Sequence, residues 1–96
     1  MKKGYIVCVY EDIKDDTSLK EYAVKAKEAV EKYNGKFLIR GGKKIVTEGQ
    51  NFVRTAVIEF SSFDIAKEFF YSKEYQEAHA LLKNTVVRNH QIIEGN

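Results

Sequence analysis

The chain has 96 residues, enough for one hydrophobic core, so we expect a single domain over residues 1–96. Its 16 basic and 14 acidic residues are scattered and give a formal net charge of +2, which favours neither nucleic acid nor an anionic membrane as a partner. No segment approaches the ~20 apolar residues of a membrane span. The one cysteine, Cys8, lies in an apolar run, as is typical of a buried thiol in a reducing compartment. These features predict a cytoplasmic protein.

The first predicted elements are a strand and a helix. Residues 4–11 form an apolar run typical of a strand. Ser18 and Glu21 have the spacing of a capping box that begins a helix, and Asn34-Gly35 is a typical helix stop. Between these signals, apolar residues recur at helical spacing along one face, namely Leu19, Tyr22, Ala23, Ala26, Val30 and Tyr33.

Two further strands follow. Residues 36–40 and 44–48 predict one interrupted strand, with Gly41-Gly42 as its bend or bulge. A turn near residue 50 then leads into a strand over residues 52–60.

The second half of the chain repeats the scheme. Ser61 or Ser62 caps a helix, and Ser72 interrupts it before a further helical stretch. The two stretches carry Ile65, Ala66, Phe69 and Phe70, and then Tyr75, Ala78, His79 and Leu82. Residues 86–93 form the closing strand. The order βαββαβ predicts an α+β, ferredoxin-like fold with a four-stranded antiparallel sheet, in which the first and third strands are central.

The predicted strands are apolar on both faces, whereas a sheet covered on one face alternates apolar with polar residues. In residues 4–11 one face carries Tyr5, Val7 and Val9, and the other carries Ile6, Cys8 and Tyr10. The helices can cover only one face of this sheet. We therefore expect a second copy of the chain on the other face, which makes the protein a homodimer.

Four segments together resemble the domain-of-unknown-function 1330 family, and the match spans nearly the whole chain. They are Gly4-Tyr5-Ile6-Val7, Phe37-Leu38-Ile39-Arg40-Gly41-Gly42, Val57-Ile58-Glu59-Phe60 with the serine-capped helix that follows, and Tyr71-Ser72-Lys73-Glu74-Tyr75-Gln76. The resemblance implies a dimeric α/β barrel, in which two sheets face each other with the helices outside, and no settled activity. Small oxygenases, isomerases and dechlorinases share this architecture, but a fold does not determine a function.

Arg40 and Glu59 are charged residues within otherwise apolar predicted strands. If the second and third strands form a hairpin that turns near Gly49-Gln50, antiparallel register places Arg40 roughly opposite Glu59. One interpretation is a structural ion pair that satisfies both charges. The other is a ligand site, in which the guanidinium offers its planar fork to a carboxylate or another oxygen-rich group.

Tyr75 and His79 are the second pair of candidates, because their i, i+4 spacing puts both on the helix stripe that should face the sheet. Taken alone, such a histidine is more often a packing residue than an acid or base. For Tyr22 we expect only a packing role, and for His90, which alternates with Arg88 and Ile92 on an edge strand, we expect a place at the subunit boundary. We nevertheless hypothesise that Arg40, Tyr75 and His79 border one cavity. Its expected walls are Tyr5, Val7, Val57 and Phe69, or their neighbours on the opposite face.

Several chemistries find no support in the sequence. Two histidines and one cysteine do not supply a metal-ligand cluster, and no phosphate-binding glycine motif or nucleophile elbow occurs, so we expect no metal and no cofactor. The aromatic pattern of RNA-recognition domains is missing from residues 51–60. The sequence favours a homodimer that binds a small anionic or oxygenated organic molecule between sheet and helices. The alternative is a cofactor-independent enzyme, monooxygenase-like or isomerase-like, acting on a small oxygenated substrate.

Overall fold

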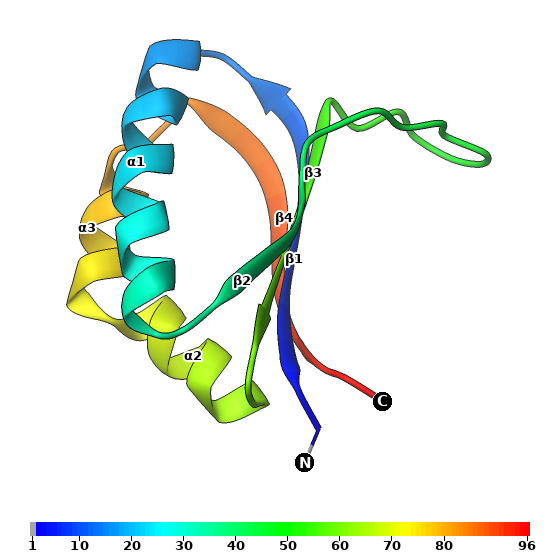
Figure 1. The fold of residues 1–96 in the computed structure, drawn as a ribbon. Coiled ribbons are helices and arrows are strands. Elements are labelled where there is room, and N and C mark those ends of the chain that lie inside the picture. The colour runs from blue at the N-terminus through cyan, green and yellow to red at the C-terminus, as the bar shows by residue number, and fades with distance from the viewer. Residues whose placement is uncertain (1) are drawn as a thin grey trace.

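A computed structural model describes residues 2–96 and shows one antiparallel sheet with helices on one side. In chain order the elements are β1 (Gly4–Ile13), α1 (Asp16–Lys32), β2 (Lys36–Arg40), β3 (Arg54–Phe60), α2 (Phe63–Tyr71), α3 (Lys73–Ala80) and β4 (Val86–Glu94). The strand order is β2-β3-β1-β4, so the first and third strands are central, as predicted. All three helices cover the same face, and the opposite face is bare (Figure 1). The ferredoxin-like α+β fold is confirmed. Across residues 2–96, no helix combines the length and apolar character needed to cross a bilayer.

Helix α1 begins three residues before the predicted capping box. Asp15 is its N-cap, and the Asp15 carboxylate accepts hydrogen bonds from the backbone N–H groups of Thr17 and Ser18. Ser18 lies inside the first turn and donates its hydroxyl to the same carboxylate at 2.9 Å. The predicted capping role of Ser18 is therefore wrong, because an aspartate is available earlier to satisfy the free N–H groups of the first turn. The helix ends as predicted, with Asn34 in the left-handed conformation at φ 57°.

The second strand is shorter than predicted. β2 ends at Arg40, and residues 44–48 form no strand. Gly41 and Gly42 take φ values of 75° and 97°, a backbone conformation that leads the chain out of the ladder. The connection over residues 41–53 then stands away from the sheet on the side opposite the helices (Figure 1). It carries Ile45, which is 87% exposed.

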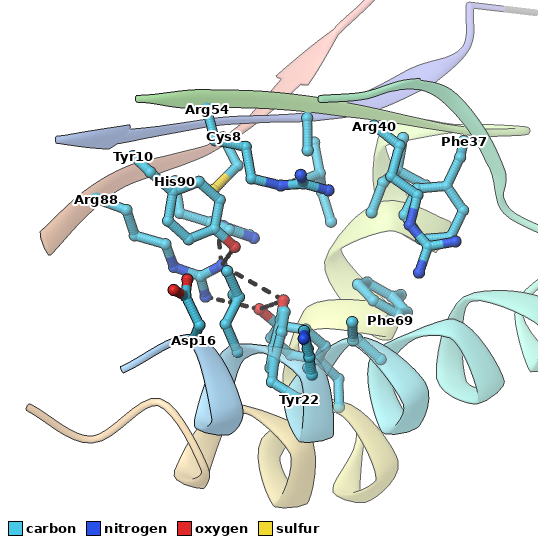
Figure 2. A pocket seen from close by; sticks show the side chains of 18 residues that line it. Cys8, Tyr10, Asp16, Tyr22, Phe37, Arg40, Arg54, Phe69, Arg88 and His90 are labelled. Atoms are coloured by element: carbon cyan, nitrogen blue, oxygen red, sulfur yellow. Dashed lines mark hydrogen bonds between the residues drawn. The ribbon is translucent and has the colours of Figure 1, made fainter. Parts of the chain in front are cut away.

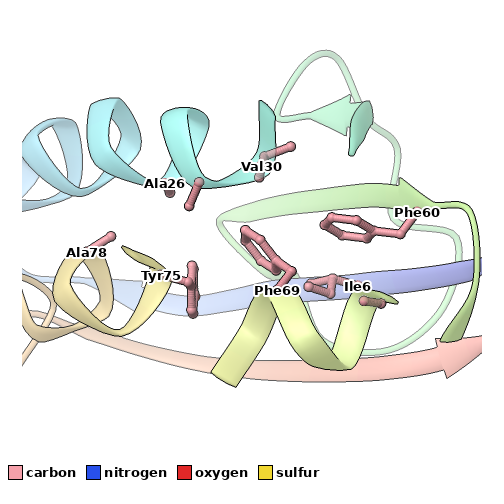
Figure 3. Packing of buried hydrophobic residues seen from close by; sticks show 9 residues of the cluster. Ile6, Ala26, Val30, Phe60, Phe69, Tyr75 and Ala78 are labelled. Carbon is pink, nitrogen blue, oxygen red and sulfur yellow. The ribbon is translucent and has the colours of Figure 1, made fainter. Parts of the chain in front are cut away.

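The core lies between the sheet and the helices and is built around Phe69 of α2. The Phe69 ring packs 4.9 Å from Phe60 and 4.8 Å from Tyr75, measured between ring centroids (Figure 3). Ser72 separates the two short helices. Its hydroxyl donates to the Phe69 carbonyl at the end of α2 and accepts from the Tyr75 N–H at the start of α3. This cap fixes where α3 begins and thereby turns Tyr75 into the core.

The register of the strands arranges the helix-facing side chains in rows across the sheet. We call this side the inner face and the opposite side the bare face. The first row, the arginine row, contains Arg54, Tyr10 and Arg88. The second, the middle row, contains Arg40, Ala56, Cys8 and His90. The third, the apolar row, contains Phe37, Ile58, Ile6 and Ile92. Polarity thus increases along the inner face toward the arginine row.

Candidate functional site

A cavity of about 270 Å³ lies between the inner face and helix α1 (Figure 2). Its apolar lining comes from the strands and from helices α1 and α2, namely Ile6, Leu19, Ala23, Ala26, Phe37, Ala56, Ile58 and Phe69. The small side chains of Ala23 and Ala26 on α1 and of Ala56 on β3 leave the space open. The predicted wall residue Phe69 does line the cavity. Tyr5, Val7 and Val57 lie on the bare face, and their neighbours Ile6, Cys8 and Ile58 line the cavity instead.

The polar centre of the cavity is Arg88, whose guanidinium donates to side chains from β1, α1 and α3 (Figure 2). Its Nη2 lies 2.9 Å from the Tyr75 hydroxyl. Its Nη1 lies 3.2 Å from the Tyr10 hydroxyl, 3.4 Å from the Tyr22 hydroxyl and 3.6 Å from the Cys8 Sγ. Nη1 has only two hydrogens for these three acceptors, so it cannot form a separate hydrogen bond with each of them, and all three contacts are long. A better acceptor entering the cavity would compete with them.

The hydrogen-bonding partners of Arg88 are neutral. Burial, followed by the neighbouring Cys8 thiol and Tyr22 hydroxyl, raises the pKa of Tyr10 to about 12. Burial, and then proximity to Tyr22, also raises the pKa of Tyr75 well above the ordinary tyrosine value. Burial acts to lower the pKa of Arg88, but its interactions with Tyr22, Tyr75 and Cys8 outweigh that effect and hold the pKa above its ordinary value. The result is a half-buried permanent cation whose hydrogen bonds go to hydroxyls and a thiol.

His90 and Cys8 stand side by side in the middle row. Burial, and then the positive charge of Arg88, lowers the pKa of His90 to about 3, so its imidazole is neutral near pH 7. Burial raises the pKa of the Cys8 thiol, which is unpaired and buried. Both side chains therefore present uncharged surface to the cavity. His90 lines the cavity, a position that its sequence did not predict.

Arg40 reaches the cavity because β2 contains a bulge. The ladder pairs Phe37 with Ile58 but Ile39 with Val57, so Leu38 is an extra residue. In a regular strand of the same five residues, alternation would turn Arg40 toward the bare face. With the bulge, Arg40 stands opposite Ala56 and lines the cavity, and its guanidinium lies 4.5 Å from the centre of the Phe37 ring.

The predicted pairing of Arg40 with Glu59 is wrong. Glu59 stands opposite Lys36 and Tyr5, three positions along β3 from Ala56, and it lies on the bare face. There it accepts a hydrogen bond from the Tyr5 hydroxyl at 3.0 Å and pairs with Lys3 at 3.7 Å. The physical reason is that residues 41–53 do not continue the ladder, so the hairpin turn does not set the register. Glu59 and Arg40 occupy opposite faces of one sheet.

Arg54 is the third arginine of the cavity and is positioned by Gly41. An added side-chain carbon on Gly41 would lie only 2.7 Å from the Arg54 Nη1, so the guanidinium packs directly against the backbone there. Within residues 2–96 the ion pairs are Lys3–Glu59 and Lys32–Glu74. None of the three cavity arginines therefore has a carboxylate partner in the described chain.

The structure brings Tyr75 and Arg40 to one cavity but does not bring His79 there. Tyr75 is 1% exposed and lines the cavity, whereas His79 is exposed and does not. The predicted position of His79 is wrong because α3 packs chiefly against α1, so its buried stripe consists of Tyr75 and Ala78. The His79 ring lies beyond it, 6.0 Å from Tyr75 between centroids.

Sequence reasoning missed Arg88 and Tyr22, the residues that meet at the polar centre. Tyr22 fits the core stripe of α1, and nothing local separates a packing tyrosine from one whose hydroxyl is used. Its hydroxyl lies 2.9 Å from that of Tyr75. Arg88 did carry a signal: it alternates with His90 and Ile92 in a strand, so it had to share their face.

Several solved structures share the fold of this chain. Among curated proteins, none matches the sequence. A protein of unknown function from Rhodopseudomonas palustris superposes with a TM-score of 0.73 at 13% identity, covering 97% of this chain and 80% of that one. A dimeric ferredoxin-like protein of unknown function from Jannaschia gives 0.67 at 9% identity, with 98% of each chain covered. A candidate antibiotic biosynthesis monooxygenase from Caulobacter crescentus gives 0.64 at 11% identity, covering 99% of this chain and 90% of that one.

Identities this low establish the shared fold alone. The family assignment comes from the sequence, because the model of one family matches residues 3–96, nearly the whole chain. The protein belongs to the DUF1330 family, which is described as a domain of unknown function.

Proposed function

We propose that the protein binds a small, partly apolar organic anion in the cavity, with Arg88 as its anchor. The observation that carries this proposal is a half-buried guanidinium whose hydrogen bonds among the described residues go to hydroxyls and a thiol, and not to a carboxylate. A charge withdrawn from water without a counter-ion is costly, and an anionic ligand would supply the missing partner. Its carboxylate would form charge-assisted hydrogen bonds with Arg88 in place of the long ones to Tyr10 and Tyr22.

The rest of the cavity supports the same class of ligand. Its lining contains the cationic side chains of Arg40, Arg54, Arg88 and Lys20 but only one carboxylate, that of Asp16. The remaining lining is predominantly apolar, which suits the hydrocarbon part of a ligand. The hydroxyl of Tyr75 and the neutral imidazole of His90 provide hydrogen-bonding groups of fixed position.

Binding without catalysis fits the titratable groups better than the enzymatic alternative. A general base works best with a pKa near the operating pH. The pKa of His90 is about 3, and the tyrosine pKa values lie above their ordinary range, so neither group has that property. A cofactor-independent monooxygenase or isomerase remains the alternative, supported by the fold shared with the Caulobacter crescentus protein.

Isothermal titration calorimetry with a panel of small aliphatic and aromatic carboxylates tests the proposal. We expect binding to the wild-type protein and a loss of affinity of about tenfold or more in Arg88→Met, because a charge-assisted contact is removed. Lys27→Met is the matched control, since Lys27 is an exposed cation outside the cavity lining. Failure of every carboxylate to bind, or equal binding by Arg88→Met and wild type, would refute the proposal.

We also propose that the bare face binds a second copy of the chain. This face carries Tyr5, Val7, Val9, Val57 and Ile93, and no element within residues 2–96 covers it (Figure 1). The Jannaschia protein with the same fold is described as dimeric. Such an interface would bury roughly 1,200 Å² or more in total.

Light scattering at micromolar concentration tests the dimer with a matched pair of variants. Val57→Lys puts a charge in the middle of the bare face, and we expect it to produce monomers. Val24→Lys adds the same charge on α1, where Val24 is already 62% exposed, and we expect it to remain dimeric. A folded wild-type monomer would refute the proposal.

The cytoplasm is the compartment we propose for the protein. Cys8 is buried and unpaired, as expected where thiols stay reduced.

A further inference from the structure

The cationic groups of the cavity lie at two separate places rather than one. Arg88 belongs to the edge strand β4, whereas Arg40 belongs to the opposite edge strand β2 and Arg54 to its neighbour β3. Adjacent strands are about 4.8 Å apart, so the backbones of β4 and β2 are separated by roughly 14 Å. Figure 2 shows Arg88 on one side of the cavity and Arg40 on the other, with Arg54 between them.

The second place is as free of counter-ions as the first. Arg54 packs against the backbone of Gly41, and Arg40 packs over the Phe37 ring at 4.5 Å. Neither contact neutralises a charge. Each contact holds the guanidinium of its own arginine beside the cavity, which both arginines line. Among the described residues, neither arginine forms an ion pair.

The surface between Arg88 and Arg40 is mainly apolar, and Tyr10 lies between Arg88 and Arg54 in the arginine row. Ala56 and Cys8 lie between Arg40 and His90 in the middle row, and Ile58 and Ile6 lie beside them in the apolar row. A ligand anchored at Arg88 and extending along this surface would bring its far end to Arg40 and Arg54.

Resting on the proposed function, we propose that the ligand is a short diacid with an apolar middle. One acidic group binds at Arg88, and the second binds at the paired site formed by Arg40 and Arg54. Arginine suits both ends, because its planar fork donates two parallel hydrogen bonds to a carboxylate. The molecule also has to be short, because the whole cavity holds only about 270 Å³.

Calorimetric titration with matched acids of about four to eight carbons tests the inference, since these acids are shorter than the roughly 14 Å between the edge-strand backbones and leave room for an arginine side chain at each end. At each length, an α,ω-dicarboxylate is compared with the monocarboxylate of equal carbon number. We expect one intermediate length at which the diacid binds the wild-type protein about tenfold or more tightly than the monoacid. In Arg54→Met and in Arg40→Met this preference should fall, because the affinity for the diacid decreases by a larger factor than the affinity for the monoacid. Arg88→Met should weaken both acids.

The outcomes separate this inference from the proposed function. If monoacids bind and depend on Arg88 but no diacid is preferred, the second site is refuted and the anion-binding function stands. A diacid preference that survives in both Arg40→Met and Arg54→Met refutes the assignment of the second site. If the wild-type protein binds neither kind of acid, both proposals fail. Circular dichroism of each variant confirms that the fold is retained.

Discussion

His90 provides a sharp test of the electrostatics of the cavity. Its ring lies 5.3 Å from Phe70 and 6.1 Å from Tyr75 between centroids, and Arg88 precedes it by two residues on the same face. Burial, and then the positive charges of Arg88 and His79, lowers its pKa to about 3. In the unfolded chain a histidine titrates near about 6.5. Between these two values, the unfolded chain binds a proton that the folded protein does not.

Stability must therefore fall as the pH is lowered from about 6.5 toward the folded-state pKa of His90. Between pH 7 and pH 5, the two pKa values give a loss from this residue of about 2 kcal/mol in the free energy of unfolding. This is a large part of the roughly 5–15 kcal/mol that holds a domain folded. It would lower the urea midpoint by about 1–2 M.

Urea unfolding at both pH values, followed by far-ultraviolet circular dichroism, measures this loss in the wild type and in His90→Gln. We expect the variant to lose about 2 kcal/mol less than the wild type over the same pH interval. His79→Gln is the control, because His79 is an exposed histidine outside the cavity lining. The lowered pKa values of Asp15 and Glu74 act at more acidic pH and equally in all three proteins. Equal losses in wild type and His90→Gln would refute the proposed environment of His90.

Three further substitutions test the cavity and the core, each by urea unfolding and the second also by calorimetry. Arg88→Met should change the free energy of unfolding by less than about 1 kcal/mol, because no carboxylate is left unpaired; a loss of several kcal/mol would show that the tyrosine hydroxyls depend on Arg88. Ala56→Leu should fill the cavity and abolish anion binding while the protein stays folded, and retained affinity would place the ligand elsewhere. Gly4→Ala should destabilise by roughly 1–3 kcal/mol, since the added carbon would lie 2.3 Å from the Ser62 carbonyl oxygen; an unchanged midpoint would contradict that close approach.

The fold was predictable because its signals are local and repeated. Short apolar runs, helical spacing and the serine at position 72 each depend on a few neighbouring residues, and they agree with one another. The place of Tyr75 followed from the same logic, since the cap at Ser72 and the apolar stripe together turn it inward.

The candidate site was only partly predictable, because its contacts join distant parts of the chain. Arg88 and Tyr22 are 66 positions apart in sequence, and their meeting depends on how α1 lies over the sheet. The error in pairing Arg40 with Glu59 has a narrower cause. Counting back from a turn assumes an unbroken ladder, whereas residues 41–53 leave the sheet and β2 contains a bulge at Leu38.

The bulge at Leu38 makes the number of residues in β2 as important as their identity. Deleting Leu38 would restore a regular ladder and still leave Phe37 and Arg40 on the cavity side, because Ile39 already pairs with Val57. Straightening the strand while keeping all five residues would instead turn Arg40 outward and bring Ile39 in. One arginine would then leave the cavity without any change of sequence. Whether an odd or an even number of ladder positions separates Phe37 from Arg40 thus decides which face of the sheet carries the charge. A residue-by-residue comparison of sequences does not register this property.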